Sequence, residues 1–204
     1  MHYLFVSILL ICNFSISSCN YSIPNFEKES KEKIKKERLQ VEITKIKSWI
    51  AIKPAVYDSK YAFFMDARIM SGNYRFFIVD LTTDSIVEEA VVAHGVGSET
   101  GIEDSLQFSN TPGSLMTSLG VYTVGGKYNG NFGPAYKLNG LETTNNKAFE
   151  RYVVLHSYQC VPFEEQLTEI CNSEGCVMLS NEFFPNLYKY LDGNKKKVLL
   201  DVYY

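Results

Sequence analysis

Short runs of β-branched and aromatic residues begin at Lys60 and constrain the fold of this chain more than any other feature. The runs "YAFFMDARI", "YRFFIVDL" and "SIVEEAVVAHG" are separated by the turn-forming segments 71–73 (Ser-Gly-Asn) and 82–84 (Thr-Thr-Asp). Runs of this length joined by short turns are typical of hairpin-connected strands. Further strands are expected at "GVYTVGG", "AYKLNG", "RYVVLHS", "CVMLS" and "KVLLDVY". The pattern therefore predicts a mainly β sandwich or barrel.

Helical signals appear on either side of these strands. The segment from Glu27 to Trp49 mixes Lys and Glu with spaced apolar residues, which predicts a helix that ends before Pro54. Its charged surface is typical of a solvated face, so we interpret the helix as a spacer. A second, short helix is expected from Asn181 to Asp192.

Length and charge limit the classes of function. The chain has 204 residues, of which 46% are hydrophobic, and this suffices for one ordinary core. The net charge is -3, which provides no basic field for gathering phosphates. We therefore expect one globular body and no nucleic-acid partner.

The N-terminus has the pattern of an export signal. An apolar run from Tyr3 to Cys12 is too short to cross a bilayer. The segment 16–19 (Ile-Ser-Ser-Cys) resembles the bacterial lipobox, which predicts a lipoprotein signal peptide over 1–18 and lipidation of Cys19. An ordinary signal peptide with an incidental cysteine is the alternative, because no Lys or Arg precedes the run. We expect an exported, membrane-anchored envelope or periplasmic protein with a tether and helical spacer over 19–55 and its body over 56–204.

Three cysteines remain in the body, namely Cys160, Cys171 and Cys176. An exported chain meets an oxidising environment, and an odd number of cysteines leaves at least one thiol free. A zinc site made by these sulfurs and His156 is one interpretation, but the spacing lacks the CxxC pair that usually supports such sites. No metal is therefore predicted.

A nucleophile is the other interpretation of this region. His156 ends one strand pattern, and Cys176 follows Gly175 at the start of another. Neighbouring strand ends bring an imidazole and a thiol together, and backbone N–H groups at Gly175 and Cys176 would then stabilise an oxyanion. On spacing alone, an inert buried cysteine beside a core histidine explains the pattern equally well.

A resemblance separates these alternatives. The positions of His156, Ser173, Gly175 and Cys176 resemble the His…Ser/Thr-x-Gly-Cys motif of YkuD-type L,D-transpeptidases, which crosslink peptidoglycan. From about Lys60 to Asp192 the chain is similar to the murein L,D-transpeptidase catalytic domain family, including "AHGVGS", "FSNTPGS" and "NNKAFERYVVLH". The resemblance implies a YkuD-like β sandwich or barrel with one or two short helices after an N-terminal helix.

The resemblance also implies a reaction. Cys176, activated by His156, would form a thioester with a peptidoglycan stem tetrapeptide, and a second stem would resolve it into a 3-3 crosslink without any cofactor. Resolution by water would make the protein an L,D-carboxypeptidase. Ser173 is expected to orient the loop that carries the cysteine. The candidate substrate-binding residues are Arg151, Tyr128, Gly130 and Tyr136, with core packing the alternative for Tyr136 and an ion pair for Arg151.

Two residues depart from the common motif. Glu174 stands where many members have His, and Met178 where many have Arg or Asn. An acidic neighbour raises a thiol pKa, which keeps open a non-catalytic peptidoglycan-binding lipoprotein. Arg151 is expected to supply the missing cation. Because an odd number of cysteines remains, Cys160 and Cys171 are predicted to form a disulfide.

Overall fold

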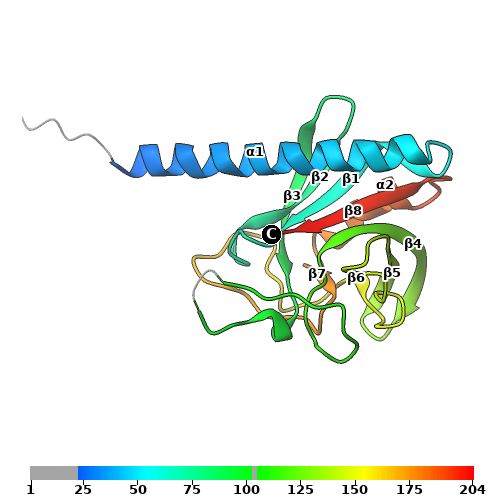
Figure 1. Ribbon diagram of the computed structural model, residues 1–204. Coiled ribbons are helices and arrows are strands. Elements are labelled where there is room, and N and C mark those ends of the chain that lie inside the picture. The colour runs from blue at the N-terminus through cyan, green and yellow to red at the C-terminus, as the bar shows by residue number, and fades with distance from the viewer. Residues whose placement is uncertain (1–22, 103–104) are drawn as a thin grey trace, which may run out of the picture. The chain divides into compact units, whose positions relative to one another are not determined.

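The computed structural model describes residues 23–102 and 105–204, so the predicted signal peptide and Cys19 lie outside the described residues. Eight strands close into a barrel in the order β1-β2-β3-β7-β6-β5-β4-β8 (Figure 1). The strands are β1 (Tyr57–Asp66), β2 (Tyr74–Asp80), β3 (Ser85–Ala93), β4 (Gly120–Gly130), β5 (Gly133–Gly140), β6 (Val154–Ser157), β7 (Val177–Leu179) and β8 (Lys197–Tyr203). The mainly β prediction is confirmed.

Helices are few within the described residues. Helix α1 spans Ile23–Ile52 and precedes the barrel, and a 3-10 turn η1 (Val96–Ser98) follows β3. The predicted late helix is a 3-10 turn η2 (Phe184–Leu187) that continues into α2 (Tyr188–Leu191). Pro185 lies in the first turn of this segment, where its missing N–H costs no hydrogen bond.

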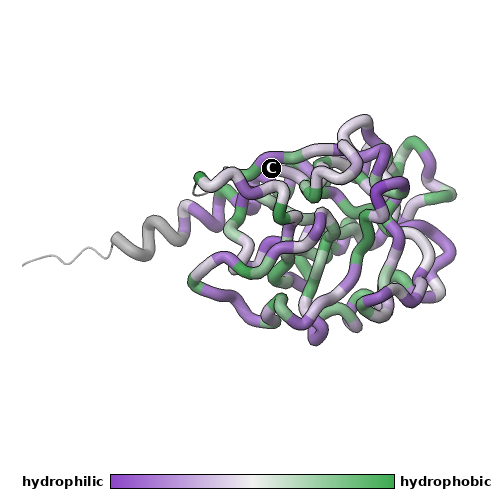
Figure 2. Tube along the Cα trace, turned by 90° about the horizontal axis from the view of Figure 1, so that it is seen from below, coloured by the Kyte–Doolittle hydropathy of each residue, from purple (hydrophilic) through white to green (hydrophobic). Residues whose placement is uncertain are grey.

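The first strand shows why its sequence is apolar on both faces. Phe63 and Met65 belong to the core inside the barrel, whereas Ala62 and Phe64 belong to a second core outside it. Alternate residues of a strand point to opposite faces, so a continuous apolar run predicts a strand that is covered on both sides. Figure 2 shows hydrophobic segments, in green, running through the middle of the body and hydrophilic ones, in purple, at many of its outer bends.

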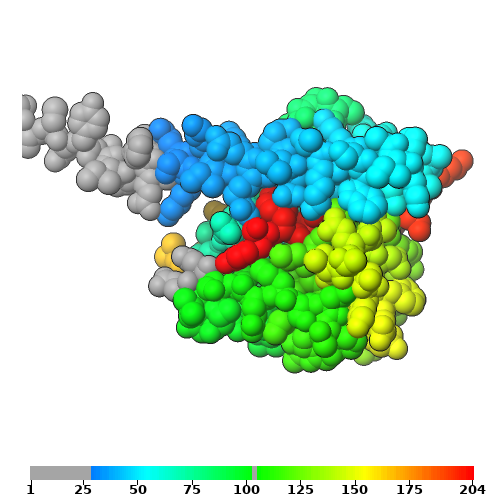
Figure 3. All heavy atoms as spheres, in the orientation of Figure 1, coloured from blue at the N-terminus to red at the C-terminus, as the bar shows by residue number. Residues whose placement is uncertain are grey.

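The second core lies under the C-terminal half of α1. Leu39, Ile43, Ile46 and Ile50 are buried against apolar residues of β1, β2, β4 and β8. Their spacing of four, three and four residues places them on one helix face. Figures 1 and 3 show this half of the helix, in cyan, over the red C-terminal strand.

Ion pairs with two buried aspartates help to hold the helix on the barrel. Arg38 Nε and Nη2 donate to the two carboxylate oxygens of Asp66 at 3.0 and 2.7 Å. Lys45 Nζ lies 2.8 Å from a carboxylate oxygen of Asp201, and both aspartates are fully buried. Residues 36–204 form one compact unit, so the body begins well before residue 56, where it was expected to begin.

No helix within residues 23–102 and 105–204 is long and apolar enough to span a bilayer.

Candidate active site

His156 and Cys176 lie on the outer face of the barrel wall. Strands β6 and β7 are parallel neighbours, with Leu155 opposite Val177 and His156 opposite Met178. Leu155 and Val177 point into the barrel core. Because side chains alternate along a strand, His156 points outward from β6, and Cys176 lies directly before β7, next to the backbone of Val154 at the start of β6. The sequence led us to expect His156 and Cys176 side by side, whereas the register pairs His156 with Met178, two positions beyond Cys176.

The surroundings of His156 orient its ring as a neutral base. Its Nδ1–H donates to the Ser157 carbonyl oxygen at 3.1 Å, since a carbonyl can only accept, and this leaves the Nε2 lone pair free. The ring stacks on Phe132, with centroids 5.5 Å apart, and Phe132 meets Tyr158 edge to face. Burial lowers the pKa of His156. The imidazole is therefore neutral and able to accept a proton at neutral pH.

Cys176 is a free, half-buried cysteine. Its Sγ lies 3.8 Å from the Tyr152 carbonyl oxygen. Burial raises the pKa of the thiol, a hydrogen bond from the Val154 backbone N–H lowers it, Glu174 raises it and Arg151 lowers it. The balance favours a thiol over a thiolate in the free protein. Among the described residues no hydrogen bond joins Cys176 to His156.

Tyr152 carries backbone strain next to the cysteine. Its φ of 57° lies in the left-handed region, which a bulky residue rarely adopts. This conformation aims the Tyr152 carbonyl at Cys176 Sγ and leaves the tyrosine ring 85% exposed. No sequence pattern indicated this residue, because a strained dihedral angle has no compositional signature in a tyrosine.

The loop before Cys176 is organised by Ser173. Ser173 Oγ donates to the Cys176 carbonyl oxygen at 2.7 Å and accepts from the Gly175 N–H at 3.1 Å. Gly175 has a φ of 109°, which favours glycine. The two hydrogen bonds close a tight turn that presents Cys176 at the start of β7. The expectation that Ser173 orients the loop is consistent with this geometry, whereas one of the two expected oxyanion donors, the Gly175 N–H, is already engaged.

The His94-Gly95 pair extends β3 to support that loop. The Ser173 N–H donates to the His94 carbonyl at 2.8 Å, and the Val96 N–H donates to the Ser173 carbonyl at 2.8 Å. Gly95 forms a parallel bridge with Ser173 and approaches Gly175 closely. These contacts give a structural reason for the "HG" sequence, for which the resemblance offered no mechanistic role.

Beneath this support lies a buried polar network. The Arg75 guanidinium donates to the Val92 carbonyl at 2.9 and 2.8 Å and to His94 Nδ1 at 2.8 Å. His94 Nε2–H then donates to Glu99 at 2.6 Å, and Glu99 also accepts from Asn172 at 3.2 Å. Burial lowers the pKa of His94, as does Arg75, so the imidazole is neutral. Sequence reasoning missed Arg75 and Asn172, because the network joins strand, turn and loop residues that are distant in the chain.

Arg151 clamps the loop of residues 109–118. Its Nη1 donates to the Ser109 carbonyl at 2.7 Å and contacts Ser118 Oγ, and its Nη2 donates to the Met116 carbonyl at 2.6 Å. The guanidinium lies beside Gly175 and lowers the pKa of Cys176. The expected cation is thus next to the thiol, but its donors are directed to this loop.

The other predicted substrate-binding residues lie on the β4–β5 hairpin. Tyr128 is opposite Ala135, and Ala135 is opposite His156, so Tyr128 lies two strands from the histidine on the same face. Gly130 ends β4 next to the turn that carries Phe132. Tyr136 is buried in the barrel core, and its hydroxyl donates to Asp192 at 2.6 Å. The core-packing alternative therefore describes Tyr136 better than contact with a substrate.

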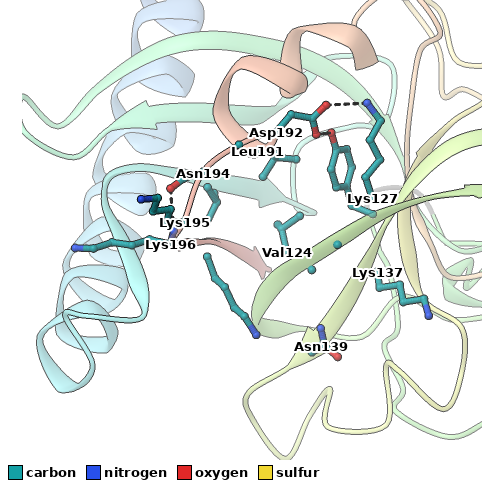
Figure 4. Close-up of a pocket in the computed structure, with 15 residues that line it drawn as sticks. Val124, Lys127, Lys137, Asn139, Leu191, Asp192, Asn194, Lys195 and Lys196 are labelled. Atoms are coloured by element: carbon teal, nitrogen blue, oxygen red, sulfur yellow. Dashed lines mark hydrogen bonds and ion pairs between the residues drawn. The ribbon is translucent and has the colours of Figure 1, made fainter.

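A cavity of about 550 Å³ lies beside this hairpin, between β4, β5 and the segment 191–198 (Figure 4). Tyr136, Lys137 and Asp192 are among its lining residues, but neither His156 nor Cys176 is. Figure 4 shows Lys127 and Asp192 joined at its rim, a contact of 2.8 Å. The cavity is thus lined by neither of the two candidate site residues.

The remaining cysteines are joined to each other. A disulfide links Cys160 and Cys171, whose Cα atoms are 6.1 Å apart, and this is the predicted pairing. It closes the loop between β6 and β7, and Cys171 packs against an apolar cluster made by Val91, Ala93, Val161 and Met178. A zinc site of three thiolates is incompatible with this bond, because two of the sulfurs are oxidised.

Comparison with protein families identifies the class of protein. Residues 30–200 match the family model for the L,D-transpeptidase catalytic domain, so the chain belongs to this family. A comparison with curated proteins found no match. The matched range includes the part of α1, residues 39–50, that packs on the barrel.

Three solved structures resemble the chain. The helical cell shape determining protein Pgp2 from Campylobacter jejuni is 16% identical with a TM-score of 0.47, over 72% of this chain and 48% of that one. An L,D-transpeptidase from Xylanimonas cellulosilytica is 16% identical with a TM-score of 0.39, over 72% and 61%. An L,D-transpeptidase from Mycobacterium smegmatis is 13% identical with a TM-score of 0.40, over 70% and 58%. This chain thus matches about half to three fifths of their lengths.

Proposed function

We propose that this protein is a cysteine L,D-transpeptidase that acts on the stem tetrapeptides of peptidoglycan and forms 3-3 crosslinks. The observation that supports the proposal is the parallel pairing of β6 and β7, because β6 carries His156 and Cys176 directly precedes β7. Membership of the L,D-transpeptidase family supports the substrate class. The hydrogen bonds of Ser173 support a catalytic role for the loop, since they present Cys176 in a fixed turn.

In the first half-reaction, Cys176 Sγ attacks the carbonyl carbon of the third stem residue. His156 Nε2 accepts the thiol proton as the carbon–sulfur bond forms. Addition of the sulfur to the carbonyl produces a tetrahedral oxyanion. Because the Gly175 N–H already donates to Ser173, we assign the Cys176 N–H as an oxyanion donor. The tetrahedral intermediate then expels the terminal D-alanine, whose amine takes the proton from His156, and a thioester remains.

In the second half-reaction, an amine of a neighbouring stem attacks the thioester carbonyl. The amine loses a proton to His156, the carbon–sulfur bond breaks, and the thiolate of Cys176 takes the proton back. The product is a 3-3 crosslink. Attack by water instead of an amine gives an L,D-carboxypeptidase with the same residues in the same roles.

One observation favours a second candidate, a peptidoglycan-binding module without catalysis. Burial and Glu174 both raise the pKa of the Cys176 thiol, which disfavours the reactive thiolate. The two candidates are separated by incubating the protein with purified disaccharide-tetrapeptide and measuring product masses. Crosslinked dimers support the transpeptidase and tripeptides the carboxypeptidase. Unchanged substrate that nevertheless binds supports the module.

We further propose that the mature protein is anchored to a membrane through lipid on Cys19, so that the domain faces peptidoglycan in the periplasm. The support is the lipobox-like segment 16–19 after a short apolar run. Globomycin should block processing, and the mature protein should partition into detergent. Recovery of the wild type in the soluble periplasm, unchanged by Cys19→Ala, would contradict this anchor.

A further inference from the structure

Lys137 lies in the same lateral row of the barrel wall as the candidate nucleophile. On β5, Lys137 is opposite Val154 of β6, and Cys176 precedes Val177, which is opposite Leu155. Cys176 and Lys137 therefore flank Val154 on its two sides. Tyr136 and Leu155 point into the barrel, so Lys137 points to the outer face that carries Cys176. Two strand spacings place the Cα atoms of Lys137 and Cys176 about 10 Å apart.

The ammonium group of Lys137 is held over aromatic rings. Its Nζ lies 5.6 Å from the Tyr128 ring centroid and 5.3 Å from the Phe149 ring centroid. Within residues 23–102 and 105–204, no ion pair with a carboxylate is found for it. Aromatic faces orient a cation without neutralising its charge. Figure 4 shows the Lys137 side chain extending away from Lys195 and Lys196, on the opposite side of the cavity.

The other cation near Cys176 has its donors in use. Arg151 donates to the carbonyls of Ser109 and Met116 and contacts Ser118. It cannot turn to a ligand without releasing the loop of residues 109–118. If a carboxylate binds near Cys176, Lys137 is therefore the cation that can pair with it.

We propose that Lys137, with Tyr128 and Phe149, forms the subsite for the C-terminal carboxylate of the donor stem tetrapeptide. This inference rests on the proposed function. The carboxylate belongs to the leaving D-alanine, the residue directly after the carbonyl that Cys176 attacks, so it lies a few ångströms from the sulfur. To meet this carboxylate, the flexible four-carbon stem of Lys137 would turn the ammonium from Tyr128 on β4 toward β6. The subsite would select stems that end one residue after the scissile bond.

The test compares Lys137→Met, Lys137→Arg and the control Lys195→Met on disaccharide-tetrapeptide and on its C-terminal amide. Lys195 is exposed and lines the same cavity as Lys137, but it lies outside the row of Lys137 and Val154. Lys195→Met therefore tests whether the loss of any lysine from the cavity lowers activity. On the free acid, Lys137→Met should lower kcat/KM by roughly tenfold, as expected for one charged hydrogen bond, chiefly by raising KM. Lys137→Arg should restore most of the activity, and Lys195→Met should match the wild type. On the amide, the wild type and Lys137→Met should be equally slow.

Equal values for the wild type and Lys137→Met on the free acid would overturn the inference and leave the proposed function intact. An equal loss on acid and amide would also overturn it, because the lysine would then act without reading the carboxylate. If the wild type converts neither substrate, the proposed function fails. Calorimetric binding to the Cys176→Ala protein then decides the subsite. If Cys176→Ala binds the acid more tightly than the amide, and Lys137→Met removes this preference, the subsite is supported. Equal binding of acid and amide by Cys176→Ala refutes it.

Discussion

Gly95 and Gly175 touch backbone to backbone, and a Cβ atom built on Gly95 would lie 2.7 Å from the Cα atom of Gly175. The same Cβ would lie 2.3 Å from the Leu115 carbonyl oxygen. No side chain fits between the end of β3 and the loop that presents Cys176. The glycine of the "HG" sequence is therefore required by packing, and main-chain atoms support the turn before Cys176.

Gly95→Ala should displace this turn. The added methyl group meets only backbone atoms, which cannot rotate away, so we expect a loss of about 1–3 kcal/mol in the free energy of unfolding. The rate of acylation at Cys176 should fall with it. Gly126→Ala is the control, because a Cβ there meets nothing within 4 Å. Urea unfolding and acylation rates measure both effects, and wild-type behaviour of Gly95→Ala would contradict the close contact.

The reactivity of Cys176 should rise with pH. Burial and Glu174 raise the pKa of the thiol, so the thiolate fraction still increases above neutral pH. Removal of a like charge favours the thiolate, and Glu174→Gln should therefore alkylate faster than the wild type at pH 7. Glu150→Gln removes an exposed carboxylate from another turn and should leave the pH dependence of Cys176 alkylation unchanged. The rate of iodoacetamide labelling from pH 6 to 10 measures this. Identical profiles for Glu174→Gln and the wild type would remove Glu174 from the explanation.

The disulfide should stabilise the loop that covers the outer face beside the site. Cys160 and Cys171 are 11 residues apart in sequence, and closing a loop of this size contributes about 2–3 kcal/mol. The double variant Cys160→Ala/Cys171→Ala should lose that free energy of unfolding, and reduction of the wild type should lower its stability similarly. Non-reducing peptide mapping identifies the bond directly. Discovery of either cysteine joined to Cys176 would refute the assignment.

The sequence predicted the strands well because each is a run of β-branched and aromatic residues between turn residues. It misplaced the role of α1, because Lys and Glu surround the buried Leu39 and Ile43 and a four-residue stripe is hard to distinguish in so charged a helix. The sequence also left two roles for Tyr136, substrate binding and core packing. A tyrosine next to a predicted site looks the same in the sequence whether its ring points into the barrel or out of it.

The supporting residues of the site could not be found from sequence. Arg75 and Asn172 are brought together through His94 and Glu99 by pairing between β3 and a loop far along the chain. Lys137 is one lysine among many, and only the register of β5 against β6 reveals that it lies opposite Val154. Local patterns indicate which segments form strands, whereas the neighbours across strands follow from the closed barrel.

The central claim is that Cys176, assisted by His156, is an acyl acceptor. The most direct test is incubation of the purified protein with a carbapenem, a β-lactam that mimics the acyl donor, followed by mass spectrometry of the intact protein and its peptides. The claim predicts one added drug mass, confined to the peptide that contains Cys176. His156→Ala should slow the addition by roughly 100-fold, the usual effect of losing a positioned base. Absence of an adduct at every pH, in folded protein with Cys176 demonstrably reduced, would contradict the claim.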